Sequence, residues 1–180
     1  MRLLLFKGLP GCGKSTLSRA LGKHLRWPVI DKDDIKDILH EQIPASGGMA
    51  YDIMLNVARR QLLQGLCVIC DSPLLYSITY ERAQAIATET EASLVIVECI
   101  CSDKDIWRQR IDARQSLLLS SHHQTDWASF RSYANESANH TTYPITHPHH
   151  IVDTCQTLPD CVTEIISWLD QLEIKPVFSL

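Results

Sequence analysis

Apolar residues along the chain gather into five short runs of β-branched and aliphatic side chains, which predict five buried strands. The runs are Arg2 to Gly8, Trp27 to Asp31, Leu66 to Asp71, Ser93 to Cys101 and His149 to Thr154. Between them, apolar residues recur at helical spacing, as in Leu17, Leu21 and Leu25. Seven helices are predicted, over residues 14–25, 34–41, 49–64, 80–89, 103–115, 126–135 and 159–172. Alternating strands and helices predict an α/β fold, with a parallel sheet covered by helices on both faces.

The loop between the first strand and the first helix carries the most informative motif of the chain. Residues 8–15 read GLPGCGKS and satisfy the phosphate-loop pattern GxxxxGK[ST]. Its glycines let backbone N–H groups surround phosphate oxygens at a helix N-terminus. The alternative is that these glycines form only an ordinary strand-to-helix turn. Lys14 is expected to reach the β- and γ-phosphates, and Ser15 to bind Mg²⁺. The expected nucleotide site comprises Gly8, Pro10, Gly11, Cys12, Gly13, Lys14, Ser15 and Thr16.

Acidic residues follow three of the other predicted strands, at the edge where α/β proteins bind ligands. Asp71 ends an apolar run in the manner of a Walker B aspartate, which would hold Mg²⁺; the alternative is a turn or a helix cap. Asp33 or Asp34 could accept the proton of an attacking hydroxyl, unless both only favour the first turn of a helix. Lys36 lies one helical turn after Asp33 and could contact an anionic part of a substrate.

Arginines on the helix predicted after the fourth strand form a candidate lid. Arg110 and Arg114 share a helix face and could both reach one phosphate group. A solvated basic face is the simpler interpretation of the spacing alone, because Trp107 and Ile111 already supply an apolar stripe.

Composition and charge narrow the classes of protein to consider. With 180 residues, of which 45% are hydrophobic, the chain is expected to form one domain over residues 1–180. The net charge of -4 disfavours a broad nucleic-acid-binding face. No apolar run approaches the roughly eighteen residues of a membrane helix, so a cytoplasmic protein is expected. The histidines of the sequence His147-Pro-His149-His150 are interpreted as surface residues of a loop.

Four segments together resemble a known family: GLPGCGKST, DKDDIK, CVICDSP and CICSDKDIWRQRIDAR, in this order. They are similar to the ATP-binding P-loop kinases of the AAA_33 type, which are related to polynucleotide 5′-hydroxyl kinases and small-molecule phosphotransferases. Further segments, such as RWPVIDKDDIKD, resemble an uncharacterised subgroup of these kinases. The resemblance implies a P-loop NTPase fold of three layers, with strand order 2-3-1-4-5 and a lid over about residues 108–126.

The resemblance also implies roles for individual residues. Asp33 matches the aspartate that activates the acceptor, and Arg110 and Arg114 match lid arginines. The segment 153–159 would lie near adenine. Lys36 occupies the position at which the polynucleotide kinases have an arginine that contacts substrate. A lysine offers a point charge, whereas an arginine can form bidentate hydrogen bonds.

Three functions are consistent with these residues. The favoured one is an ATP- and Mg²⁺-dependent kinase that phosphorylates a hydroxyl of a small molecule. A polynucleotide 5′-hydroxyl kinase is disfavoured by Lys36 and by the acidic net charge. The third is an ATP-binding sensor that transfers no phosphate.

Overall fold

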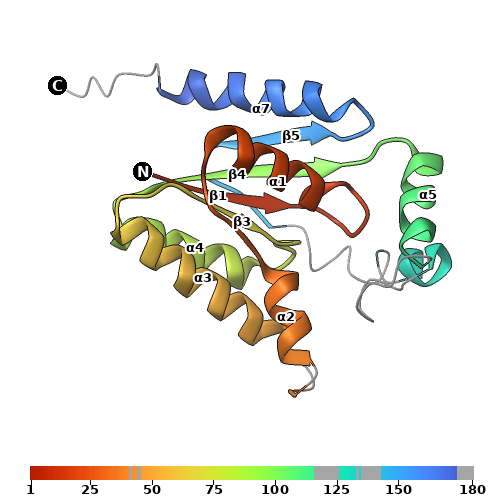
Figure 1. The fold of residues 1–180 in the computed structure, drawn as a ribbon, viewed down its shortest axis with the longest axis horizontal. Helices are drawn as coiled ribbons and strands as arrows, with labels where there is room; N and C mark the ends of the chain where they lie inside the picture. Colours follow the sequence, from red (N-terminus) through yellow and green to blue (C-terminus); the bar gives the residue numbers. More distant parts are fainter. Residues whose placement is uncertain (41, 44–45, 116–125, 133, 135–142, 174–180) are drawn as a thin grey trace.

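A five-stranded parallel sheet forms the centre of the fold. The computed structural model describes residues 1–40, 42–43, 46–115, 126–132, 134 and 143–173. The strands are β1 (Arg2–Lys7), β2 (Val29–Asp31), β3 (Val68–Asp71), β4 (Ser93–Ile100) and β5 (His149–Asp153). Their order is β2-β3-β1-β4-β5, so β1 lies in the middle between β3 and β4 (Figure 1). Strand number, direction and order are those expected from the sequence.

Helices cover both faces of the sheet and complete the three layers. The helices are α1 (Lys14–Leu25), α2 (Lys32–His40), α3 (Gly47–Leu63), α4 (Ser77–Glu89), α5 (Lys104–Gln115) and α7 (Leu158–Glu173). Residues 127–132 are also helical, within the predicted 126–135. In Figure 1, α1 and α7 lie on one side of the sheet, and α3 and α4 lie on the other. Among the described residues, no helix is long and apolar enough to cross a membrane.

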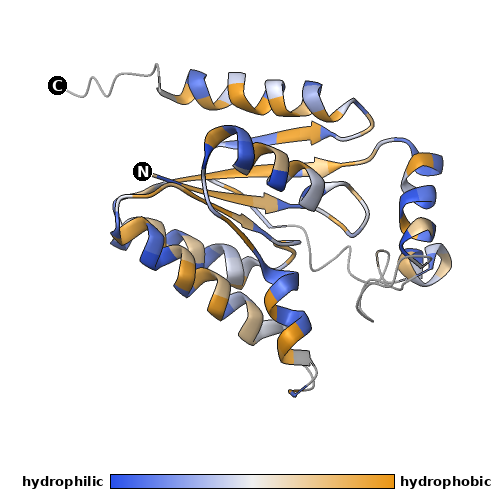
Figure 2. Ribbon diagram, in the orientation of Figure 1, coloured by the Kyte–Doolittle hydropathy of each residue, from blue (hydrophilic) through white to orange (hydrophobic). Residues whose placement is uncertain are grey.

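Alternate residues of the central strand supply the two hydrophobic cores. Leu3 and Leu5 pack with α3 and α4, whereas Leu4 and Phe6 pack with α1 and α7. All four side chains are fully buried. Each contributes roughly 1.5–3 kcal/mol through the removal of apolar surface from water. The strands are accordingly mostly apolar, and the outer surfaces of the helices carry many polar residues (Figure 2).

Because all the strands are parallel, their carboxyl ends meet at one edge of the sheet. The phosphate loop follows β1 at this edge, while Asp31, Asp71 and Asp153 end β2, β3 and β5. The structure therefore brings together the strand ends that the sequence marks as polar.

Candidate functional site

The phosphate loop is packed closely enough that its glycines cannot be replaced without distortion. Gly8 and Gly13 have φ angles of 138° and 82°, in the region that side chains with a Cβ rarely adopt. A Cβ on Gly8 would lie 2.4 Å from the backbone oxygen of Cys99. The loop therefore lies directly against the end of β4, with its backbone bent as the motif predicts.

Lys14 is held against this loop. Its side chain is buried, and its Nζ donates a hydrogen bond to the carbonyl oxygen of Leu9 at 2.9 Å. The ammonium group of the first residue of α1 is thus positioned beside the loop backbone, where a phosphate oxygen could replace Leu9 as its acceptor.

Asp71 lies beneath the first turn of α1, next to a second carboxylate. It is buried and accepts a 2.8 Å hydrogen bond from Ser18 Oγ, which also lies 3.2 Å from the backbone oxygen of Ser15. Burial and the neighbouring Asp71 raise the pKa of Asp31 to about 6. A carboxylate whose ionisation is opposed by a neighbouring carboxylate contributes to a site that favours a divalent cation.

The donor set fits Mg²⁺ with few protein ligands. Ser18 Oγ contacts both the Asp71 carboxylate and the backbone of Ser15, so these two residues lie close together. Hydroxyl and carboxylate oxygens are ligands that suit Mg²⁺. In the described part of the chain, no three His, Cys, Asp or Glu residues are grouped as a metal site. Water and phosphate oxygens would therefore supply most of the coordination.

The acidic start of α2 adjoins these groups. Asp33 is half-buried, and its Oδ1 lies 2.5 Å from Nζ of Lys32, a buried lysine that also lies over the ring of Tyr51. Asp31 Oδ1 accepts the backbone N–H of Asp33 at 2.9 Å, which starts the helix at Lys32 instead of at the predicted Asp34.

Arg110 and Arg114 line one pocket together with the phosphate loop. The pocket measures about 380 Å³ and is also bounded by Gly11, Gly13 and Thr154. Arg110 donates from both terminal nitrogens to Thr154, at 2.8 Å to Oγ1 and 2.7 Å to the carbonyl oxygen. The helix face that carries Arg110 and Arg114 is therefore turned toward the phosphate loop. The spacing alone had favoured a face that is only exposed to solvent.

A tryptophan of helix α5 fixes this helix beside the phosphate loop. Trp107 Nε1 donates a 2.8 Å hydrogen bond to the carbonyl oxygen of Pro10, and its ring packs against Trp127 and Phe130. Within the lid expected over residues 108–126, residues 116–125 lie outside the described part of the chain.

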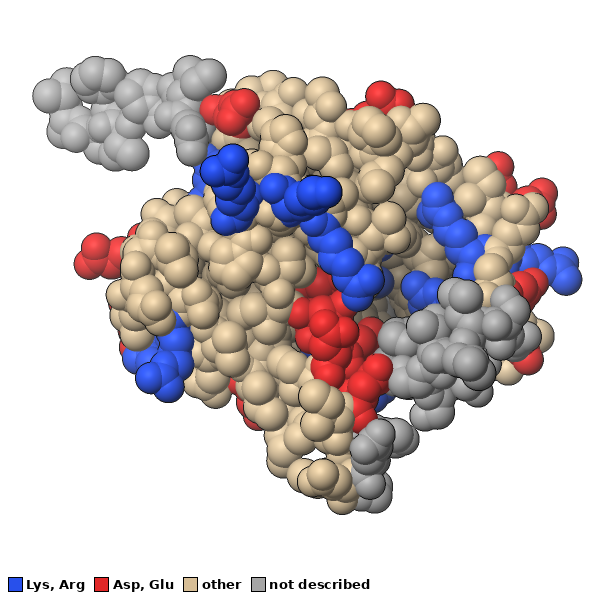
Figure 3. All heavy atoms as spheres, viewed as in Figure 1, with Lys and Arg blue, Asp and Glu red and all other residues tan. Residues whose placement is uncertain are grey.

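Opposite charges face each other across this edge of the molecule. Acidic side chains gather over α2 beside a hollow, and basic side chains lie on its other side toward α5 (Figure 3). The acidic side suits a cation, and the arginine side suits phosphate.

Comparison with known proteins identifies the family. The AAA_33 family model, described as an AAA domain, matches residues 3–132, which include the phosphate loop, Asp71 and α5. The chain belongs to the AAA_33 family. No curated protein is significantly similar to it in sequence.

Solved structures of kinases share the fold of this AAA_33 protein. A candidate kinase from Chloroflexus aurantiacus aligns with a TM-score of 0.75 at 24% identity, over 94% of this chain and 97% of that chain. A sugar kinase from a Janibacter species gives 0.68 at 13% identity, over 94% and 95%. A gluconokinase from Sinorhizobium meliloti gives 0.64 at 18% identity, over 95% and 93%. At these identities the likeness shows a P-loop kinase-like fold.

The AAA_33 structure groups some of the predicted site residues and separates others. Gly11, Gly13 and Thr16 of the loop line the arginine pocket. Cys12 is buried and faces a second pocket on the other side of the loop. Lys36 is half-buried on α2 and, like Asp33, lines neither of these two pockets.

One residue of the AAA_33 site, Thr154, was not assigned a role from the sequence. Thr154 joins α5 to the loop, because its Oγ1 donates to the carbonyl oxygen of Cys12 at 2.9 Å and accepts from Arg110. Only its position after the last strand pointed to it.

The predicted strand from His149 is confirmed in this AAA_33 protein, whereas the interpretation of its histidines as surface-loop residues was wrong for two positions. His149 and His150 begin β5, and both are half-buried. Their Nε2 atoms pair with Glu98 at 3.0 Å and with Glu164 at 2.8 Å. His149 and His150 are therefore ion-pair partners, and His147 Nδ1 lies 2.7 Å from Tyr80 Oη. The other histidines of the second half, His122, His123 and His140, lie outside the described residues.

Proposed function

We propose that the chain, acting as one domain, is a Mg²⁺-dependent kinase that transfers the γ-phosphate of ATP to a hydroxyl of a small molecule. The observation that carries this proposal is the shared pocket, in which Arg110 and Arg114 face the phosphate loop. This arrangement offers cations and backbone donors on two sides of one phosphate chain.

The nucleotide occupies the arginine pocket in this proposal. The β- and γ-phosphates lie on the loop that runs from Gly8 to Thr16, with Lys14 exchanging Leu9 for a phosphate oxygen. The base extends toward Gln156 and Leu158, which line the far end of the same pocket. This orientation follows from the position of the loop at the N-terminus of α1, where an anion is favoured.

Ser15 and Asp71 are the proposed holders of Mg²⁺. A Mg²⁺ ion bound there would neutralise charge on the β- and γ-phosphates. Ser18 keeps Asp71 oriented through its 2.8 Å hydrogen bond. The raised pKa of Asp31 supports the assignment, since a carboxylate pair at this position is stabilised by a cation.

Asp33 is the proposed base. The acceptor hydroxyl oxygen forms a bond to the γ-phosphorus, the bond from that phosphorus to the β,γ-bridging oxygen breaks, and ADP leaves. The hydroxyl proton passes to the Asp33 carboxylate. Lys32 Nζ lies 2.5 Å from this carboxylate, and Lys36 on the next turn is the proposed contact to the acceptor. Asp31 is the second candidate base, because a pKa of about 6 is closer to neutral pH.

Arg110 and Arg114 are proposed to stabilise negative charge on the transferring phosphoryl group, as part of a lid over residues 108–126. The contacts of Trp107 with Pro10 and of Arg110 with Thr154 support this role, because they keep the base of the lid at the loop.

A polynucleotide acceptor has less support. The acidic side chains over α2 would repel a phosphodiester backbone approaching this side of the site (Figure 3). A sensor without transfer would share the nucleotide pocket but would need no base.

The test is an assay of phosphoryl transfer from ATP with Mg²⁺. Acceptors are pooled hydroxyl-bearing metabolites and, separately, a 5′-hydroxyl oligonucleotide. Variants Lys14→Ala, Asp33→Asn and Asp31→Asn are compared with Asp52→Asn. Asp52 is an exposed acid paired with Arg82 on the outer side of α3, so Asp52→Asn is the matched control.

A small-molecule pool should accept phosphate, and Asp33→Asn should lower kcat about a hundredfold or more while the Kd for ATP stays unchanged. Lys14→Ala should abolish transfer, and Asp52→Asn should have no effect. Equal ATP binding by the wild type and Asp33→Asn, with no transfer to either acceptor class, would instead support the sensor.

A further inference from the structure

A second pocket lies on the opposite side of the phosphate loop from the arginine pocket. It measures about 470 Å³ and is bounded by Gly8, Leu9 and Cys12 of the loop. The arginine pocket is bounded by Gly11, Gly13 and Thr16 of the same loop. The loop is therefore a common wall between two pockets, and the second one is large enough for a small molecule.

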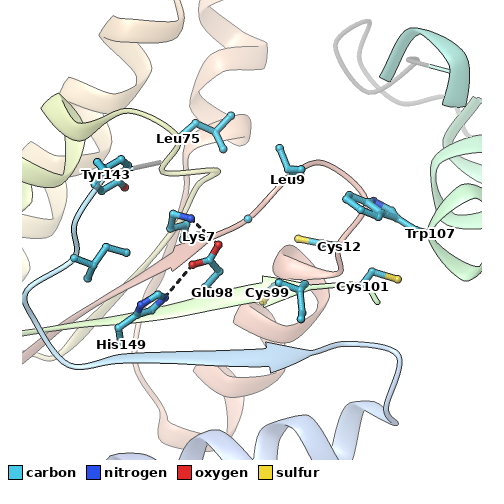
Figure 4. Close-up of a pocket in the computed structure, with 13 residues that line it drawn as sticks. Lys7, Leu9, Cys12, Leu75, Glu98, Cys99, Cys101, Trp107, Tyr143 and His149 are labelled. Atoms are coloured by element: carbon cyan, nitrogen blue, oxygen red, sulfur yellow. Dashed lines mark hydrogen bonds and ion pairs between the residues drawn. The ribbon is translucent and has the colours of Figure 1, made fainter. Parts of the chain in front are cut away.

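The upper walls of this pocket are apolar and aromatic. Leu9, Leu75, Tyr143 and Trp107 surround it, with Tyr143 and Trp107 at opposite ends (Figure 4). Tyr143 Oη donates a 2.7 Å hydrogen bond to the carbonyl oxygen of Leu74. Its ring also lies 5.6 Å from that of Tyr80. The aromatic wall is thus fixed in position before any ligand binds.

A chain of charged side chains forms the floor. Lys7 Nζ lies 2.6 Å from Glu98 Oε1, and His149 Nε2 lies 3.0 Å from Glu98 Oε2 (Figure 4). The three residues come from β1, β4 and β5. Their side chains remain 12%, 21% and 24% exposed, so they can hydrogen-bond to a molecule in the pocket. An ammonium and a carboxylate side by side offer donors and acceptors that match hydroxyl groups.

The charge on this floor is balanced. Glu98 offsets the charge of Lys7, and among the described residues no arginine and no other lysine lines the pocket. An anionic acceptor, such as a sugar acid or a sugar phosphate, would meet the Glu98 carboxylate without an excess cation to compensate. Burying such an anion against apolar walls would cost free energy.

We propose that this pocket binds the phosphoryl acceptor, and that the acceptor is an uncharged molecule combining hydroxyl groups with an apolar or aromatic part. The inference rests on the proposed kinase function. The hydroxylated part lies on Lys7, Glu98 and His149, and the apolar part lies between Tyr143 and Trp107. The reacting hydroxyl reaches the γ-phosphate past Leu9, a residue of the pocket wall whose carbonyl oxygen accepts from Lys14. Asp33 and Lys36 do not line this pocket, so in this proposal they contact the acceptor only at its reacting hydroxyl.

The test compares two panels of acceptors. The uncharged panel contains ribonucleosides, aldohexoses and inositol; the anionic panel contains gluconate and glucose 6-phosphate. Binding is measured by calorimetry in the presence of Mg²⁺ and a non-hydrolysable ATP analogue, and transfer is measured separately with ATP. The double variant Lys7→Met/Glu98→Gln removes both charges with little change in shape, and Leu75→Trp fills the apolar end. The control is Arg59→Met/Glu89→Gln, which removes an exposed ion pair between α3 and the end of α4.

A ribonucleoside, which combines hydroxyl groups with an aromatic base, should bind and accept phosphate better than the aldohexoses and inositol, which lack an apolar part, and the anionic panel should not bind. Both pocket variants should raise the KM or Kd for this acceptor about tenfold or more while ATP affinity is retained, which also shows that they fold. The control should change neither value.

The two ways of failing are distinguishable. Binding of an uncharged molecule that is weakened by the pocket variants, but without transfer, would refute the kinase function and keep the pocket assignment. Transfer that the pocket variants leave unchanged, or that occurs only with the anionic panel, would refute the pocket assignment and keep the kinase. No binding by any uncharged compound would also refute the assignment.

Discussion

Asp31 carries a carboxyl group whose ionisation the fold opposes. Burial, and then the charge of Asp71, raise its pKa from 3.8 to about 6. Below about pH 4 the carboxyl is protonated in both the folded and the unfolded chain, so this group does not lower the free energy of unfolding there. As the pH rises from about 4 to 6, the unfolded chain releases the proton first, and the folded state becomes progressively less stable.

Replacement by asparagine should therefore stabilise the protein at neutral pH. The shift alone corresponds to about 3 kcal/mol, which solvent screening at this partly exposed position reduces to roughly 1–2 kcal/mol. Asp31→Asn should raise the free energy of unfolding by that amount at pH 7.5 and by almost nothing at pH 4. Urea denaturation without Mg²⁺ measures it, with Asp52→Asn as the control. A gain of equal size at both pH values would contradict the assigned cause.

At the residue scale, prediction from sequence succeeded where a backbone conformation limits the choice of side chain. Gly8 and Gly13 indicate the phosphate loop in the sequence, because few other residues tolerate their φ angles. Asp31 and Glu98 could not be assigned in this way. The electrostatics of Asp31 depend on Asp71, forty residues away in sequence, and Glu98 reads as a polar interruption in an apolar strand until Lys7 and His149 lie beside it.

At the scale of elements, the hydroxyl group of Thr154 connects helix α5, the phosphate loop and strand β4. Thr154 follows β5, receives Arg110 of α5, and contacts the carbonyl oxygens of Cys12 in the loop and Ile100 in β4. Its side chain is buried, so the loss of its hydroxyl would leave polar groups without this partner.

Thr154→Val should weaken nucleotide binding about tenfold and lower the free energy of unfolding by roughly 1–2 kcal/mol, because α5 loses its anchor beside the loop. Thr154→Ser keeps the hydroxyl and should retain most of the affinity. Titration with a fluorescent ATP analogue and urea denaturation measure the two effects. If Val and Ser bind nucleotide equally well, the hydroxyl does not position α5.

Element boundaries were predictable where they depend on local signals. Helix α1 covers the predicted residues because the phosphate loop ends in Gly13 and the apolar spacing continues to Leu25. Helix α2 begins earlier than predicted because Asp31 accepts a hydrogen bond from its first turn. The pairing of His149 with Glu98 depends on the register between β4 and β5, which a single sequence does not specify.

At the scale of the whole molecule, nucleotide binding should stabilise the fold. A ligand at a hundred times its Kd adds about 2.7 kcal/mol, which raises the Tm of a protein of this size by roughly 5–10 °C. A Mg²⁺ complex of a non-hydrolysable ATP analogue should give this shift by scanning fluorimetry.

Lys14→Ala should abolish most of the shift, whereas Lys23→Ala, an exposed lysine on the same helix, should keep it. An undiminished shift in Lys14→Ala would place the nucleotide elsewhere.

The central position of β1 has a consequence for how the protein is made. Arg2 pairs with Ser93, and Leu3 pairs with Val68, so both neighbours of β1 come from far along the chain. At a synthesis rate of about 5–20 residues per second, β1 waits roughly 5–20 s for the end of β4. Until β3 has been made, four fully buried side chains, Leu3 to Phe6, have no neighbouring strand, and until β4 has been made one edge of β1 stays unpaired. We therefore expect the newly made chain to cover its most apolar segment by transient burial against α1 or by binding a chaperone.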